Sequence, residues 1–189
     1  MIIKLLSRIK EKSVHDNVPI VRERTIEYIQ KYIIDHKYTS YLEIGTAYGY
    51  SAAQIERVES VNKIVSVEKN EHNYKIAKNF LFKSTRITLV NEDAFLYEPK
   101  ETFDVIFLDG PKSHQDVLLE KYAKYLNNDG IIFIDNMFLK KFDHYKVLSK
   151  NNLALIKKNK EFNDWLVNNK NFKTEIINMD DGLAVVKPI

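Results

Sequence analysis

Five acidic residues recur along the middle of the chain, each at or beside the end of a short apolar run. They are Glu43, Glu68, Asp93, Asp109 and Asp135. In open α/β proteins the carboxyl ends of the strands meet at one edge of the sheet, where ligands bind. Carboxylates crowded at such an edge repel one another, so the set favours a bound cation or a hydroxyl-rich ligand. Taken singly, each acid has a structural explanation, since Asp93 and Asp109 could cap helices and Asp135 could form a turn.

The turn after the first apolar run, from Glu43 to Ser51, carries glycine at positions 45 and 49. Glycine lets the backbone approach a ligand closely. The turn is neither the G-x-G-x-x-G of dinucleotide-binding proteins nor a phosphate-binding loop with its lysine. Glu43 would repel a pyrophosphate but suits a positively charged ligand. Glu68, 25 residues further on, stands where a ribose-binding acid belongs. Together these features indicate S-adenosylmethionine.

Asp109, Asp135 and Asn136 are three oxygen donors at the ends of neighbouring apolar runs. Mg²⁺ prefers oxygen ligands at about 2.1 Å in octahedral geometry and keeps positions open for substrate or water. Two carboxylates and one amide would leave room for a bidentate substrate and one water. Lys112 follows Asp109 by three residues, so its amine could reach the same cavity. Beside a metal ion and a sulfonium its pKa would fall, which would make it a usable general base, although it could equally be a solvated surface residue.

The composition excludes several other classes of site and protein. With 44% hydrophobic and 12% aromatic residues in a chain of 189, the sequence can bury a core, which argues against disorder. The absence of cysteine excludes disulfides, thiolate metal sites and a cysteine nucleophile, and the five histidines lack zinc-site spacing. We find neither an apolar run long enough to cross a membrane nor a secretory signal. The sequence predicts a soluble, cytoplasmic protein without a membrane partner.

The formal net charge of +3 hides two basic segments. Residues 1–24 hold six Lys and Arg against three acids, and residues 138–160 hold seven lysines against Asp143 alone. Aromatic residues interleave the lysines of the second segment, as in proteins that contact a phosphate backbone. A solvated helix face in a lysine-rich chain is the alternative interpretation. Charge therefore suggests a polyanionic partner without establishing one.

Strand-like and helical patterns alternate along the chain and would position these residues. Short apolar runs over 40–44, 63–68, 86–90, 104–108 and 130–134 predict strands, while 25–36, 51–58, 71–82 and 114–126 have helical spacing. A further helix is expected to end near 165–169, before strands over 173–177 and 183–187 joined by a turn at 179–182. The pattern predicts one α/β domain over 1–189, with strand and helix repeated five times and a closing hairpin.

Several of these motifs carry a family resemblance. LEIGTAYGYS, VIFLDGPK and IIFIDN resemble the motifs of metal-dependent, catechol-type O-methyltransferases with the class I, Rossmann-like methyltransferase fold. With VPIV at 18–21 and FNDWLVNN and DGLAVVK near the C-terminus, the chain resembles the bacterial tRNA 5-hydroxyuridine methyltransferases over roughly residues 17–187. The resemblance implies a mostly parallel seven-stranded sheet with an antiparallel last strand and helices on both faces. It also implies a homodimer.

The resemblance further implies the reaction and the residues that carry it. S-adenosylmethionine would methylate the O5 hydroxyl of 5-hydroxyuridine at the wobble position in the tRNA anticodon loop, giving 5-methoxyuridine. Mg²⁺ or Mn²⁺, held by Asp109, Asp135 and Asn136, would chelate the adjacent O4 and O5 of the base. Lys112 and Asp109 would be the catalytic residues, with Lys112 as the catalytic lysine. The implied cofactor contacts are Val18, Glu43, Gly45, Ser51, Glu68, Asp93, Ala94 and Asp109. Within this set Ser51 would contact the methionine carboxylate, Glu68 the ribose, and Asp93 and Ala94 the adenine.

Contacts with the RNA are expected from lysines of the second basic segment, namely Lys140, Lys141, Lys146, Lys150, Lys157 and Lys158. The nearest alternative is a catechol or caffeoyl-type O-methyltransferase with the same metal site and a small-molecule substrate. A non-catalytic RNA-binding protein on the same fold is another, but a dead site has no reason to retain three metal donors beside Lys112. A nicotinamide-dependent oxidoreductase is disfavoured by Glu43 and by the missing third glycine.

Overall fold

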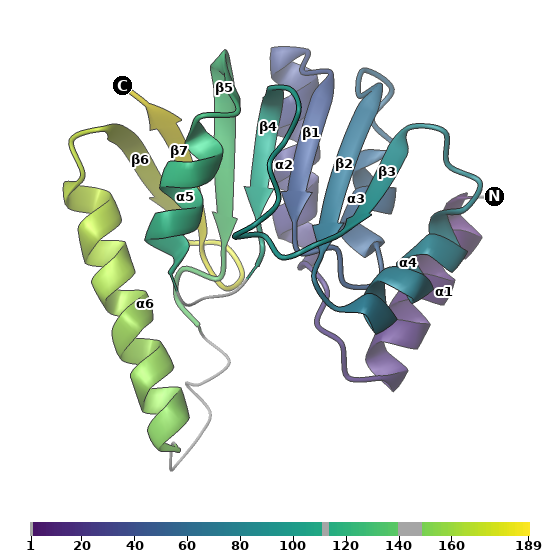
Figure 1. Cartoon of the computed structure of the whole chain (residues 1–189), viewed down its shortest axis with the longest axis horizontal. Coiled ribbons are helices and arrows are strands. Elements are labelled where there is room, and N and C mark those ends of the chain that lie inside the picture. The colour runs from purple at the N-terminus through teal and green to yellow at the C-terminus, as the bar shows by residue number, and fades with distance from the viewer. Residues whose placement is uncertain (1, 111–113, 140–148) are drawn as a thin grey trace.

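The computed structural model describes residues 2–110, 114–139 and 149–189 (Figure 1). The strands of the described chain are β1 (Ser40–Ile44), β2 (Lys63–Glu68), β3 (Ile87–Asn91), β4 (Phe103–Leu108), β5 (Leu126–Asp135), β6 (Phe172–Ile177) and β7 (Leu183–Pro188). The helices are α1 (Ile2–His15), α2 (Glu23–His36), α3 (Tyr50–Ile55), α4 (Glu71–Leu81), α5 (Gln115–Ala123) and α6 (Lys150–Asn168). None of the described helices is both long enough and apolar enough to span a bilayer.

The strands form one seven-stranded sheet in the order β3-β2-β1-β4-β5-β7-β6. The pairings from β3 to β5 are parallel, and β7 runs antiparallel to both of its neighbours. The predicted mostly parallel sheet with an antiparallel last strand is therefore confirmed. From β1 the chain first builds the sheet outward through β2 and β3, then returns to β4 on the other side of β1. Ligands of open α/β sheets bind at such a reversal, beyond the carboxyl ends of the strands, which form the lower edge in Figure 1.

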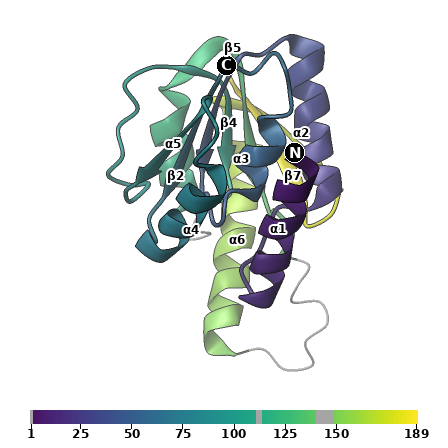
Figure 2. The same ribbon diagram turned by 90° about the vertical axis from the view of Figure 1, so that its right-hand side faces the viewer.

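Helices cover both faces of the sheet (Figure 2). Side chains of α1, α2, α3 and α4 share one buried cluster with the sheet, and those of α5 and α6 share the other. Successive residues of a strand point to opposite faces, and accordingly Ile131 and Phe133 of β5 join the first cluster while Ile132 and Ile134 join the second. Near-continuous apolar strands are thus explained by burial on both sides.

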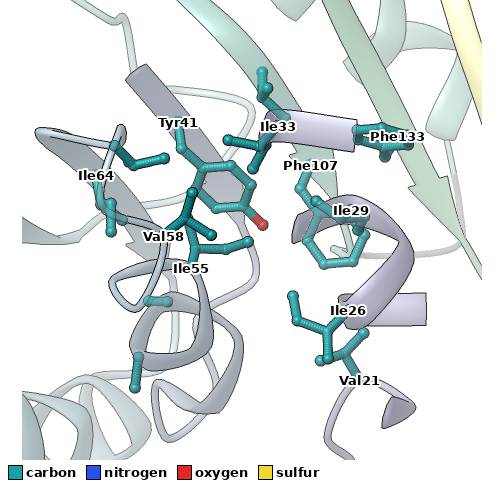
Figure 3. Close-up of a cluster of buried hydrophobic side chains, with 14 of the residues drawn as sticks. Val21, Ile26, Ile29, Ile33, Tyr41, Ile55, Val58, Ile64, Phe107 and Phe133 are labelled. Atoms are coloured by element: carbon teal, nitrogen blue, oxygen red, sulfur yellow. The ribbon is translucent and has the colours of Figure 1, made fainter. Parts of the chain in front are cut away.

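The helix α2 shows how an apolar stripe fixes a helix on the sheet. Ile26, Ile29 and Ile33 are spaced three and four residues apart, so they lie on one helical face, and all three are at most 1% exposed. Figure 3 shows this stripe directed toward the aromatic rings of Tyr41 and Phe107. Full burial of such side chains stabilises the fold by roughly 1.5–3 kcal/mol each.

The N-terminal segment contains a helix that the sequence analysis missed. Residues 1–24 are expected only to be basic, yet Ile2–His15 forms α1, whose Leu6 and Ile9 are buried against the rest of the first cluster. The exposed Lys10 forms an ion pair with Glu23 at 2.6 Å. The segment therefore contributes to the core as well as to the basic surface.

The predicted strand–helix alternation is wrong between β3 and β4. The described residues 92–102 form turns and no helix there. Asp93 closes a single turn, because its side chain accepts a hydrogen bond from the backbone N–H of Phe95 at 3.0 Å and its carbonyl accepts one from Tyr97 at 2.9 Å. Pro99 lacks a backbone N–H and prevents the turn from continuing as a helix.

Candidate cofactor and metal site

A cavity of about 690 Å³ lies at the carboxyl edge of the sheet, at the reversal between β1 and β4. It is bounded by the ends of β1, β2, β4 and β5, by the segment that leads into α2, and by the turn between β6 and β7. Among the described residues the lining consists of Val18, Pro19, Ile20, Arg22, Ile44, Gly45, Ala47, Val67, Glu68, Lys69, Asn73, Ala94, Asp109, Gly110, Asp135, Asn136 and Asp181. Its size suits a nucleotide-sized ligand.

Gly45 allows β1 and β4 to converge at the floor of this cavity. Its φ of +108° lies in the region that favours glycine, and a Cβ at this position would lie 2.4 Å from the backbone oxygen of Asp109. The N–H of Gly45 donates to the carbonyl of Val67 at 2.9 Å, which ties the turn to β2. A side chain at position 45 would therefore push the turn away from the backbone of Asp109.

Glu68 lies where the sequence analysis expects the ribose-binding acid. It ends β2 and lines the cavity, and its two carboxylate oxygens accept backbone N–H groups of Ala47 (2.8 Å) and Asn70 (2.7 Å). These bonds fix the carboxylate. Because each carboxylate oxygen has two acceptor positions, capacity remains for the hydroxyls of a ribose.

Glu43 and Ser51 do not line the cavity formed by the described residues. Both are buried, and the hydroxyls of Ser51 and Ser66 donate to the two oxygens of Glu43. Burial raises the pKa of Glu43 to about 7, the two serine hydrogen bonds oppose the rise, and the charge of Asp109 adds to it. The structure therefore places Glu43 and Ser51 behind the cavity lining, and their expected contacts with the cofactor stay a prediction. The hydrogen bond between Ser51 and Glu43 links the start of α3 to the end of β1 within the buried interior.

This burial predicts a pH-dependent cost to stability. Between the ordinary pKa near 4.5 and the folded value of about 7, the unfolded chain loses the Glu43 proton first, so native stability falls as pH rises through this window. Glutamine carries no such proton. We therefore compare the free energy of unfolding of Glu43→Gln with that of the native protein at two pH values. The value for the variant minus the value for the native protein should rise by about 2 kcal/mol from pH 5 to pH 8. Urea unfolding of both proteins at the two pH values measures it, and an equal difference at both would contradict the expected ionisation.

The predicted adenine contacts are separated. Ala94 is buried and lines the cavity, whereas Asp93 is not in the lining formed by the described residues. The carboxylate of Asp93 pairs with Lys69 at 2.7 Å, and this hydrogen bond together with that of the Phe95 N–H lowers its pKa. Since Asp93 belongs to the turn after β3, its side chain is used in closing that turn. The expected contact of Asp93 with adenine stays a prediction.

The three predicted metal donors meet at the wall of the cavity beneath β4 and β5. Asp109, Asp135 and Asn136 all line it, and Nδ2 of Asn136 lies 3.5 Å from Oδ1 of Asp109. Asp135 is 4% exposed, and its Oδ1 accepts the backbone N–H of Asn136 at 2.8 Å. The structure thus brings together the three side chains that the sequence analysis expects to bind a metal ion, and the metal binding itself stays a prediction.

The donor set fits a hard divalent cation. Neighbouring ligands of an octahedral ion at about 2.1 Å lie about 3 Å apart, close to the separation of the Asp109 and Asn136 side chains. The two ends of an amide differ only in the assignment of O and N, so rotation would present the Asn136 oxygen to the ion. Within the described part of the chain no three acidic or histidine side chains form a metal cluster. The candidate donors are therefore limited to the two carboxylates and the amide that line the cavity wall.

The remaining predicted residues fall partly outside the described ranges. Lys112 lies in 111–113, and Lys140, Lys141 and Lys146 lie in 140–148. Lys150, Lys157 and Lys158 are on α6, where they are exposed.

The cavity also has wall residues that the sequence analysis missed. Arg22 reaches it from the segment before α2, and its Nε donates to Asp181 at 3.3 Å. The neighbouring Asp180 accepts hydrogen bonds from the backbone N–H and the hydroxyl of Thr25, at 3.0 and 2.9 Å. The sequence signals this region only through Asp180-Asp181-Gly182, which indicates a hairpin turn. That pattern does not indicate that Asp180 bonds Thr25, which lies 155 residues earlier in the chain.

Comparison with known proteins places this geometry among methyltransferases. A solved Staphylococcus aureus structure, provisionally named a caffeoyl-CoA O-methyltransferase, is 27% identical with a TM-score of 0.87 over 96% of this chain and 90% of that one. A Bacillus cereus O-methyltransferase solved in complex with SAH shares the fold at 19% identity, with a TM-score of 0.79 over 97% of this chain and 90% of that one.

A curated relative from Thermoplasma volcanium, provisionally named a cobalt-precorrin-6B C(15)-methyltransferase (decarboxylating), is 31% identical over 104 residues. That match covers 53% of this chain and 52% of the relative, so it spans about half the length of each. A family model described as O-methyltransferase matches residues 3–189. The chain therefore belongs to the O-methyltransferase family.

Proposed function

We propose that the protein transfers a methyl group from S-adenosylmethionine to the O5 hydroxyl of 5-hydroxyuridine at the tRNA wobble position, with Mg²⁺ or Mn²⁺ bound. One observation carries the proposal: a single cavity brings together the glycine turn at Gly45, the acid Glu68 and the three oxygen donors at the ends of β4 and β5. Family membership supports methyl transfer, and the narrower substrate rests on the resemblance of the sequence motifs.

The β1–β2 side of the cavity would hold the methyl donor. Glu68 is fixed by two backbone N–H groups and would accept the ribose hydroxyls, while the small Ala94 leaves space for the adenine. The Gly45 backbone would pass under the methionine part. Val18 would close the cavity from the N-terminal side.

The β4–β5 side would hold the acceptor. A divalent ion bound there supplies Lewis-acid chemistry, which lowers the pKa of a hydroxyl and orients it. Asp109, Asp135 and Asn136 would hold that ion, and Lys112, placed by sequence alone, would take the hydroxyl proton. Because donor and acceptor would share one cavity, proximity would supply much of the rate acceleration.

The helix α6 supports an RNA partner. Its N-terminal half extends beyond the carboxyl ends of the strands, on the side of the molecule where the cavity lies (Figure 1). Lys150, Lys157 and Lys158 are exposed on this helix, and Lys157 has an acidic neighbour, Glu161, at 3.7 Å. Phosphates beside a bound anticodon base would be within reach of a positively charged helix placed in this way. The expected homodimer stays a prediction.

We expect the affinity for tRNA to fall steeply as the salt concentration rises. Replacement of Lys150, Lys157 and Lys158 by glutamate should make the slope of log K against log [salt] less negative by about 2 to 3. Fluorescence anisotropy with labelled tRNA at several salt concentrations measures it. A matched triple reversal at the amino edge of the sheet, at the exposed Lys100, Lys124 and Lys173, should leave the slope unchanged. Equal slopes for all three proteins would exclude α6 as the contact.

A small-molecule acceptor is the second candidate, favoured by the name of the Staphylococcus aureus relative. Both candidates use the same metal site and differ in the acceptor. Labelled S-adenosylmethionine offered with 5-hydroxyuridine-containing tRNA or with caffeoyl and catechol compounds separates them by the product that carries the label.

The gene itself provides the test of the proposal. Mass spectrometry of tRNA nucleosides from cells with and without the gene should show 5-methoxyuridine disappearing and 5-hydroxyuridine accumulating in the deletion. Unchanged 5-methoxyuridine would refute the tRNA assignment.

A further inference from the structure

The three residues that follow β5 are held from two sides. On one side, the backbone N–H of Met137 donates to the carbonyl of Gly182 at 3.1 Å, and that of Phe138 donates to Asp181 at 2.8 Å. On the other side, α6 contributes two asparagine side chains. The loop that carries the predicted metal ligand Asn136 is thus clamped between the β6–β7 turn and α6.

The backbone of Asn136 is in the left-handed conformation. Its φ is +63°, in the left-handed region that is uncommon for non-glycine residues, although asparagine adopts it more readily than most. Such a conformation persists where surrounding contacts hold it. Release of the clamp would let Asn136 return to an ordinary conformation and carry its side chain away from Asp109.

Asn163 makes the stronger of the two contacts from α6. Its Nδ2 donates to the carbonyl of Met137 at 2.6 Å, while its Oδ1 is buried without a hydrogen-bond partner among the described residues. A buried acceptor left in this state destabilises the fold. The hydrogen bond to the loop thus fixes the orientation of the Asn163 amide and leaves its oxygen buried without a partner among the described residues. An apolar side chain would serve the packing of the helix without this cost.

Asn159 lies one helical turn earlier, on the same face of α6. It is 4% exposed, and its Nδ2 donates to the carbonyl of Asn136 itself at 3.4 Å. Residues four apart on a helix are neighbours, so the two amides bond successive carbonyls of the loop.

We propose that Asn159 and Asn163 are positioning residues that hold the end of β5 in its metal-binding geometry. This inference rests on the proposed function, because it takes the divalent-ion site as given. Groups that orient metal ligands typically change metal affinity by 10- to 100-fold when they are removed. The two asparagines touch neither the reacting atoms nor the methyl donor in the proposed arrangement.

The test is Mn²⁺ binding to the full chain, followed by electron paramagnetic resonance, in the native protein, Asn163→Leu and Asn168→Leu. Leucine is close in size to asparagine and removes both the donor and the buried oxygen. Asn168 is the matched control, because it is exposed on the same helix and bonds only the carbonyl of Asp164 among the described residues. Calorimetric binding of S-adenosylmethionine and urea unfolding establish that each variant is folded.

We expect Asn163→Leu to bind Mn²⁺ at least tenfold more weakly, with S-adenosylmethionine affinity and stability close to native, and Asn168→Leu to match the native protein throughout. Mn²⁺ affinity of Asn163→Leu within twofold of native would overturn the inference while leaving the proposed function intact. A native protein that binds no Mn²⁺ would overturn the proposed metal site and this inference with it. Loss of S-adenosylmethionine binding in step with Mn²⁺ would show a general structural role and also overturn the inference.

Discussion

Replacement of Asp135 by alanine is expected to lower methyl transfer by about a thousandfold or more, because Lewis-acid stabilisation by a bound metal is worth several kcal/mol. Asp135 is 4% exposed at the cavity wall and is one of two carboxylates in the donor set. S-adenosylmethionine would bind on the β1–β2 side, so its affinity should change by less than about threefold. Steady-state methyl transfer and calorimetric titration of the same preparation measure both quantities.

EDTA should reproduce the loss in the native protein, and added Mg²⁺ should restore it. The control variant is Asp129→Ala, which removes an exposed acid near the opposite end of the same strand and should retain native turnover. Native-like turnover of Asp135→Ala would show that the trio does not serve the chemistry.

Gly45→Ala is expected to have the second largest effect. The new Cβ would lie 2.4 Å from the backbone oxygen of Asp109, and residue 45 has a φ of +108°. Because the clash is with backbone, no side chain can rotate to relieve it. Strain of this kind costs on the order of 1–3 kcal/mol before the clash is counted. We expect the unfolding free energy to fall by about 3 kcal/mol and S-adenosylmethionine affinity to fall at least tenfold, as measured by urea unfolding and calorimetry.

Gly110→Ala is the comparison for Gly45→Ala, because it adds the same methyl group on the other side of the same junction. Gly110 does not require a positive φ, and its Cβ would lie 3.1 Å from Cγ2 of Ile44, a longer contact than the 2.4 Å expected at Gly45. Its effect on stability should be smaller. Equal and small effects of both substitutions would mean that the close approach of β1 and β4 is unimportant.

Much of the sheet could be predicted because its strands are marked locally. The run from Gly130 to Ile134 is apolar on both faces, and its alternate side chains enter the two opposite clusters as a strand requires. The turn at 179–182 is similarly marked by Asp and Gly, and both Asp180 and Gly182 have positive φ values. The proximity of Asp109, Asp135 and Asn136 could be expected because parallel strands bring their carboxyl ends together whatever the loops do.

Features that depend on contacts across the chain were not predictable in the same way. The ion pair of Arg22 with Asp181 and the asparagine contacts of α6 join segments with no shared local pattern. Glu43 was expected at the cavity because it is near the end of β1. It precedes the last residue of that strand, however, so its side chain lies beneath the edge and is enclosed by Ser51 and Ser66.

The most direct measurement is methyl transfer in vitro from labelled S-adenosylmethionine to tRNA purified from cells that lack this gene, in buffer containing Mg²⁺ and in buffer containing EDTA. We predict label in 5-methoxyuridine at the wobble position with Mg²⁺ and none with EDTA. Label that survives EDTA, or that appears in a different nucleoside, would contradict the account.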